Sequence, residues 1–169
     1  MKQSTLLLGI TGGISAYKLT DLASRLTKEG VRVLTVMTQG AQQFITPLTM
    51  ETLTKQRCYT QLFDRDTPQE VTHIWLAQQA DAVLIAPATA NFLAKMTYGL
   101  ADDLLSSVLL ATTAPVLVSP AMNVHMYRHP ATQQNLAALK KRGVQIIPPE
   151  EGMLACGETG EGRLPNTET

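Results

Sequence analysis

Residues 5–15 read TLLLGITGGIS, a continuous apolar run that leads directly into a glycine turn. Continuous rather than alternating apolarity is typical of a strand that is buried on both faces, as in a parallel sheet. An amphipathic helix is predicted at residues 16–29, and residues 31–37 (VRVLTVM) form a second apolar run. This strand–turn–helix–strand order predicts the right-handed crossover of an α/β domain.

The alternation of strands and helices continues to about residue 147. Further strands are predicted at 82–86, 115–119 and 144–147, helices at 41–45, 47–53, 71–80, 92–96, 104–111 and 131–142, and an irregular stretch at 57–68. The pattern predicts a doubly wound parallel sheet with helices on both faces, flavodoxin- or Rossmann-like. We expect one domain over residues 1–169, in which the Pro- and Gly-rich residues 148–169 form a loop or flap over a site.

Composition excludes several classes of protein. With 14 Lys and Arg against 14 Asp and Glu, the net charge is zero, so nucleic-acid binding is not expected. No apolar run reaches the ~18 residues that a membrane span requires. The two cysteines, Cys58 and Cys156, suit a reducing cytoplasm, and Cys58 is expected to be structural. The charged fraction of 17% is low, which predicts that much of the surface is hidden between subunits.

The first glycine turn is a candidate phosphate site. Gly12, Gly13 and Ser15 lie between a buried strand and a helix start, where backbone N–H groups and the helix dipole favour an anion. A tight turn without a ligand is the alternative. The second strand ends at Thr38 with no carboxylate for a ribose hydroxyl, which counts against NAD and favours a mononucleotide. Thr38 itself either meets the ligand or is a simple turn residue.

Two later strands end in similar loops, PATANF at 87–92 and PAMNVHMY at 120–127. In doubly wound sheets, ligands bind beyond the carboxyl ends of the strands. Small residues there allow a flat ring to lie against the backbone, and Asn supplies both donors and acceptors. Asn91 is also explained as a plain helix cap.

Four motifs, GGISAYK at 12–18, PATAN at 87–91, PAMN at 120–123 and LACGE at 154–158, resemble the flavin-dependent cysteine decarboxylases. The resemblance is strongest to the phosphopantothenoylcysteine decarboxylases of coenzyme A biosynthesis, which in bacteria are often fused to a phosphopantothenate–cysteine ligase. It implies FMN, a phosphorylated cysteinyl substrate, a homotrimer or dodecamer, and a site shared between subunits. A ligase is then expected as a fused or separate partner.

The resemblance also implies roles for individual residues. His73 would be the base that assists thiol oxidation, and Cys156 would return a proton to the decarboxylated enethiolate. Substrate contacts would come from Met122, Asn123 and Ala155, and FMN contacts from Gly12, Gly13, Ser15, Thr38, Thr89, Ala90, Asn91, Phe92 and Ala121. Phe92 departs from the family, which usually has Thr there, and so does Leu164, where Met is usual.

Other titratable residues have plainer explanations. His125 and His129 have a spacing that can suit a metal, but Pro130 follows directly, so the pair is not expected within one regular helix, and no metal is expected. Asp102 and Asp103 are adjacent and point apart, so one of them is predicted to cap the helix that starts at residue 104. His73 lies near a helix start, where the dipole favours a neutral imidazole, although residues 67–70 (TPQE) fit an earlier capping box.

Three other functions remain open at this point: a peptidyl-cysteine decarboxylase of lantibiotic maturation, a non-catalytic flavin-binding regulatory subunit, and a relative of the prenyl-FMN synthases. Cys156 argues against the first, because an enzyme that stops at the enethiol needs no proton donor. The chain ends before the family's final helix, so we expect a truncated chain or one half of a longer protein.

Overall fold

The computed structural model describes residues 3–64 and 71–168. Within these residues, six parallel strands form one sheet in the order β3-β2-β1-β4-β5-β6. The strands are β1 (Thr5–Ile10), β2 (Arg32–Met37), β3 (Cys58–Tyr59), β4 (Ala82–Ala88), β5 (Val116–Pro120) and β6 (Gln145–Ile146). The prediction of a doubly wound parallel sheet is confirmed.

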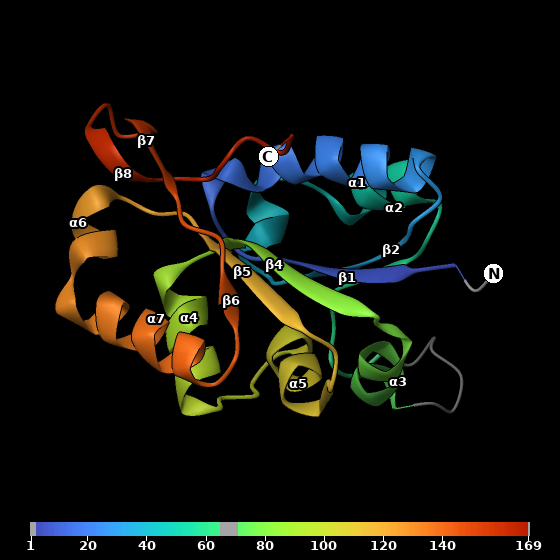
Figure 1. Ribbon diagram of the computed structural model, residues 1–169. Coiled ribbons are helices and arrows are strands. Elements are labelled where there is room, and N and C mark those ends of the chain that lie inside the picture. Colours follow the sequence, from blue (N-terminus) through green and yellow to red (C-terminus); the bar gives the residue numbers. More distant parts are fainter. Residues whose placement is uncertain (1–2, 65–70, 169) are drawn as a thin grey trace.

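Helices cover both faces of this sheet (Figure 1). On one face lie α1 (Lys18–Lys28) and α2 (Pro47–Thr54), and on the other lie α3 (Thr72–Gln79), α4 (Ala90–Tyr98), α5 (Leu104–Ala111) and α7 (Pro130–Lys141). Short 3-10 helices at Ile14–Tyr17 and Ala41–Gln43 follow β1 and β2. Each face therefore has its own apolar core, one around Leu8, Leu19 and Met50 and the other around Leu7, Phe92 and Leu105.

The strand order changes direction between β1 and β4. From β1 the chain moves outward to β2 and β3, and from β4 it moves the other way to β5 and β6. The loops after β1 and β4 therefore leave in opposite directions, and the crevice between them is where such sheets bind ligands. Thr11 joins the two strand ends, because its hydroxyl donates to Pro87 O at 2.6 Å and accepts from Thr89 N–H at 3.1 Å.

The prediction of a loop over residues 148–169 is wrong for its central part. β7 (Glu150–Met153) and β8 (Thr159–Arg163) form an antiparallel hairpin, placed beside α6 (Val124–Arg128) in Figure 1. Glycine is rare in strand interiors, so the sequence did not predict this hairpin. In the structure, its glycines allow other residues to pack closely against it. Met122 N–H donates to Gly162 O at 3.0 Å, and Gly160 packs against Val124. Whether the hairpin opens stays a prediction.

Three other segments differ from the sequence-based expectations. β3 lies in the stretch predicted to be irregular, because Cys58 and Tyr59 pair with β2. α6 occupies part of the 120–127 loop, and its N-cap is Asn123. α1 begins at Lys18 rather than residue 16, after a 3-10 turn.

Two sequence-based helix caps meet different outcomes. Asp103 caps α5 in a capping box with Ser106, as predicted for one of the two aspartates. The proposed box at residues 67–70 lies outside the described residues. No helix within residues 3–64 and 71–168 is both long and apolar enough to cross a membrane.

Candidate functional site

A pocket of about 710 Å³ lies where β1, β4 and β5 end and the β7–β8 hairpin returns. Its volume falls within the range of small-molecule and cofactor sites. Many of the residues singled out from the sequence line it: Gly12, Gly13, Ser15, Thr89, Ala90, Ala121, Met122, Asn123, Ala155 and Cys156. The four sequence motifs, which are far apart in the chain, thus meet at one site.

The wall formed by the glycine turn is narrow because backbone approaches backbone. A Cβ on Gly12 would lie 3.0 Å from the Cα of Gly40, and a Cβ on Gly13 would lie 3.2 Å from Cγ of Pro87. Larger residues at these positions would push the turn away from the neighbouring strand ends. The pocket therefore has a flat wall of small residues and backbone, which suits a planar ring or a phosphate.

Two cations line the same pocket. They are Lys18, whose Nζ donates to Leu164 O at 3.3 Å, and Arg163. Burial and the positive charge of Arg163 lower the pKa of Lys18. This pair gives the pocket an affinity for anions that the neutral net charge of the chain does not reveal.

On the hairpin side, a cluster of polar side chains surrounds Cys156. Asn123 Nδ2 donates to Glu158 Oε2 at 2.7 Å and lies 3.5 Å from Cys156 Sγ. Cys156 Sγ lies 3.6 Å from Glu158 Oε2, and His125 Nε2 lies 3.6 Å from Glu158 Oε1. An amide donor, a thiol and a carboxylate therefore meet at the mouth of the pocket, which is a set of groups suited to binding an anion and moving a proton.

The structure does not bring every predicted residue to this pocket. His73 lies on α3, on the opposite side of the sheet from the hairpin in Figure 1, and is not among the lining residues. Thr38 accepts a hydrogen bond from Ala41 N–H at 3.2 Å, as a turn residue does. Asn91 is exposed in the first turn of α4, whose N-cap is Thr89.

Phe92 is not among the residues that line the pocket. Its side chain is 2% exposed and packs in the core beneath the sheet, because the α4 register turns it inward. It therefore offers a ligand no side-chain contact, and only its backbone, whose N–H donates to Thr89 at 3.2 Å, lies near the loop.

The histidines of the 120–130 segment are now explained. His129 lies between α6 and α7, where its Nδ1 accepts from Ala131 N–H at 3.1 Å and caps α7. His125 lies in α6, whereas His129 caps the end of α6 and Pro130 begins α7, so the expectation that the pair does not lie within one regular helix is confirmed. In the described part of the chain, no three or more His, Cys, Asp or Glu residues are grouped to hold a metal ion.

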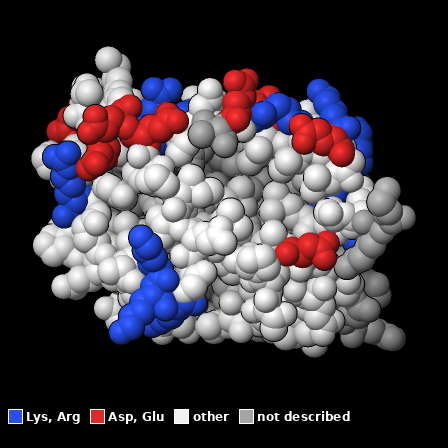
Figure 2. All heavy atoms as spheres, viewed as in Figure 1, with Lys and Arg blue, Asp and Glu red and all other residues white. Residues whose placement is uncertain are grey.

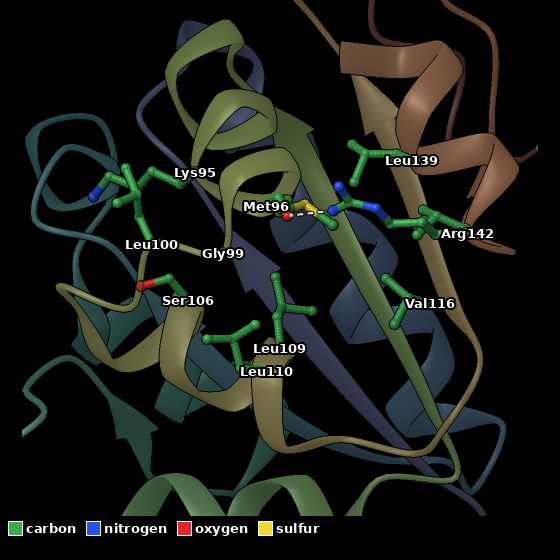
Figure 3. A pocket seen from close by; sticks show the side chains of 11 residues that line it. Lys95, Met96, Gly99, Leu100, Ser106, Leu109, Leu110, Val116, Leu139 and Arg142 are labelled. Carbon is green, nitrogen blue, oxygen red and sulfur yellow. Dashed lines mark hydrogen bonds between the residues drawn. The ribbon is translucent and has the colours of Figure 1, made fainter.

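A second, smaller pocket of about 190 Å³ lies between α4, α5 and α7 (Figure 3). It is lined mainly by leucine, valine and methionine side chains, and its polar groups already have partners. Lys95 pairs with Asp102 at 2.7 Å and Asp103 at 3.0 Å. Arg142 donates to Thr97 O at 2.7 Å and to Met96 O at 3.5 Å, the contact drawn in Figure 3. It therefore presents little chemistry for a ligand.

Comparison with known proteins shows the family to which the chain belongs. The family profile described as Flavoprotein matches residues 1–169. The chain belongs to the Flavoprotein family. It is 45% identical over 168 residues to the coenzyme A biosynthesis bifunctional protein CoaBC of Bacillus subtilis, covering 99% of this chain and 41% of that protein. It is 46% identical over 166 residues to a probable phosphopantothenoylcysteine decarboxylase of Streptococcus mutans, covering 97% of this chain and 93% of that one.

A similar protein is also found among the solved structures. A cysteine-to-serine mutant of a PPC decarboxylase, complexed with pantothenoylaminoethenethiol, is 30% identical with a TM-score of 0.86, covering 99% of this chain and 93% of that chain. The chain thus spans about two fifths of its bifunctional relative and nearly the full length of its single-function relatives.

Several pocket residues were not assigned from the sequence. Lys18 stood inside a quoted motif but drew no role, because one lysine on a helix is an ordinary surface residue. Glu158 ends the quoted LACGE motif and Arg163 follows it, but neither was given a role, because only the hairpin fold brings Glu158 to Asn123 and Arg163 close to Lys18. The pairing of LACGE with PAMN was the one usable hint.

Proposed function

We propose that this chain is an FMN-dependent phosphopantothenoylcysteine decarboxylase, which converts 4'-phospho-N-pantothenoylcysteine to 4'-phosphopantetheine in coenzyme A biosynthesis. The observation that carries the proposal is the meeting of Asn123 and Cys156 at a pocket whose opposite wall is the Gly12–Gly13 turn. The family and the relatives at 45–46% identity support it.

The pocket fits a flavin mononucleotide. Gly12 and Gly13 present only backbone to the pocket, Ser15 offers a hydroxyl, and Ala90 and Ala121 are small lining residues at the strand ends. The strand β2 ends without an acidic residue, which suits a mononucleotide. When bound, FMN would supply two-electron redox chemistry, so that the thiol-bearing carbon can be oxidised and the electrons left by CO₂ loss have a place to go.

The chain's own residues then bind, orient and protonate. Asn123 Nδ2 is a donor for the substrate carboxylate or amide, and its orientation is fixed because Asn123 Oδ1 accepts from His125 N–H at 2.8 Å. Cys156 lies within 3.5 Å of the same amide and would give its proton to the decarboxylated enethiolate. Lys18 and Arg163 would favour the phosphorylated part of a ligand.

The structural relative supports the role of Cys156. It is a cysteine-to-serine mutant complexed with an aminoethenethiol, the species expected to remain when reprotonation fails. A peptidyl-cysteine decarboxylase that releases an enethiol would have no use for Cys156 at this position. The retained Cys156 and Asn123 also argue against a non-catalytic regulatory subunit.

We also propose that the active form is a homotrimer or a higher assembly of trimers, in which a neighbouring copy supplies His73. Within one chain, α3 and the hairpin lie apart (Figure 1). Figure 2 shows a face on which Lys, Arg, Asp and Glu gather mainly at the rim, while its middle carries few charges. Exposed Ile14, Tyr17 and Ile74 are further candidates for burial between copies. A phosphopantothenate–cysteine ligase, fused as in the bifunctional relatives, is the expected functional partner.

Subunit complementation tests the shared site and the chemistry together. His73→Asn and Cys156→Ser chains, neither of which is expected to form 4'-phosphopantetheine alone, are unfolded, mixed in equal amounts and refolded. In randomly mixed assemblies about a quarter of the sites receive one intact His73 and one intact Cys156 from different copies. We expect about a quarter of the parental rate of 4'-phosphopantetheine formation to return. A mixture as inactive as its parents, while each variant retains FMN, would contradict the shared site.

A further inference from the structure

We propose that Glu158 holds, in the free site, the position that the substrate carboxylate takes on Asn123, so that the substrate must displace it. This inference rests on the function proposed above. Glu158 Oε2 accepts from Asn123 Nδ2 at 2.7 Å and lies 3.6 Å from Cys156 Sγ. A carboxylate oxygen that touches both the amide donor and the thiol stands where the reacting carboxylate of a cysteinyl substrate is expected to bind.

The Asn123 amide has no spare donor for a second carboxylate. Its Oδ1 caps α6 by accepting from His125 N–H at 2.8 Å and Met126 N–H at 3.4 Å, so its Nδ2 must face the hairpin. The two hydrogens on Nδ2 are directed to Glu158, at 2.7 Å, and to Cys156, at 3.5 Å. A substrate carboxylate that binds to Nδ2 therefore replaces Glu158.

The Glu158 side chain can leave Asn123 and return to it. Its side chain is 47% exposed and the residue lies immediately before β8, so the side chain can turn into water without loss of core packing. Its other contact is exposed His125, 3.6 Å from Oε1. Two carboxylates cannot share one amide donor at contact distance, because like charges repel. Once CO₂ has left, the competing charge is gone, and Glu158 can again bridge Asn123 and Cys156.

This arrangement makes Glu158 a specificity-determining residue. It disfavours every ligand carboxylate on Asn123, and it leaves ligands that lack one unaffected. The parental site therefore binds the carboxylate-free product more strongly, relative to substrate, than the Asn123 contact alone would allow.

The test is a binding comparison on the FMN-loaded protein. The first probe is 4'-phospho-N-pantothenoylserine, which keeps the carboxylate and replaces the thiol by a hydroxyl. The second is the corresponding ethanolamine amide, which lacks the carboxylate. In Glu158→Gln we expect the dissociation constant of the serine probe to fall on the order of fivefold. That of the ethanolamine probe should change less than about twofold, within the spread of surface substitutions.

Glu161→Gln is the matched control. Glu161 lies in β8, three residues after Glu158, and pairs with Arg128 at 3.4 Å. This variant should leave both dissociation constants unchanged. If Glu158→Gln weakens the serine probe, or shifts both probes equally, Glu158 does not compete with the carboxylate and the inference is overturned. If the parental protein binds FMN and releases CO₂, but Glu158→Gln leaves the ratio of the two dissociation constants unchanged, only this inference is refuted. If the parental protein neither binds FMN nor releases CO₂, the proposed function is refuted as well.

Discussion

Gly162→Ala should undock the β7–β8 hairpin while leaving the sheet folded. Gly162 has a φ of +139°, and a Cβ there would lie 2.2 Å from Met122 O. The obstacle is a backbone atom, so no side chain can move aside. Residues other than glycine in this region cost about 1–3 kcal/mol. The clash between the added Cβ and Met122 O is relieved only if the Met122–Gly162 hydrogen bond of 3.0 Å breaks, which costs about 0.5–1.5 kcal/mol. The hairpin therefore loses about 2–4 kcal/mol of docking free energy.

Amide hydrogen exchange measures this loss directly. Protection of residues 150–163 should fall by more than tenfold, since about 1.4 kcal/mol corresponds to a factor of ten. Protection in β1 and β4 should not change, because opening is local. Gly157→Ala is the matched control: its φ is +84°, but its Cβ would meet nothing within 4 Å, so strain alone acts and the effect should be smaller. Parental protection of the hairpin in Gly162→Ala would refute the reasoning.

Cys156→Ser should release CO₂ yet fail to form the saturated amine, because a hydroxyl is a far weaker acid than a thiol; product analysis by mass spectrometry would reveal parental amine formation if this is wrong. Burial, with Glu51 nearby, raises the pKa of Cys58 from 9.0 to about 12. The unfolded chain therefore ionises first, so stability should fall as pH rises from 9 towards 12, and Cys58→Ala should flatten that slope in urea titrations. Phe92→Ala should cost about 3–5 kcal/mol of unfolding free energy, and a loss below 1 kcal/mol would contradict its core placement.

The fold could be predicted from local patterns because its strands are buried on both faces. Runs such as residues 5–10 and 82–86 are apolar throughout, and crossovers between them leave little choice of topology. The hairpin could not be predicted in this way. Gly160 and Gly162 look like loop residues, and their fit against Val124 and Met122 O exists only after the long-range packing is formed.

The candidate site could also be predicted only in part. Gly12, Gly13 and Asn123 could be identified as candidates because they follow apolar strands, and a parallel sheet brings the ends of such strands together. The burial of the Phe92 side chain could not be predicted, because the start of a helix is uncertain by a residue or two in the sequence and its register decides which residues face the core. Glu158 was missed because Asn123, to which it accepts a hydrogen bond, is thirty-five positions away in the sequence.

The central claim is that this chain decarboxylates a cysteinyl substrate with a bound flavin. The most direct measurement is an anaerobic incubation of the purified protein with 4'-phospho-N-pantothenoylcysteine, in which the visible spectrum, CO₂ and 4'-phosphopantetheine are followed together. We predict a yellow protein that releases FMN on denaturation and forms one CO₂ and one 4'-phosphopantetheine for each substrate consumed. A colourless protein that does not bind added FMN, or a flavin-loaded protein that releases no CO₂, would contradict the account.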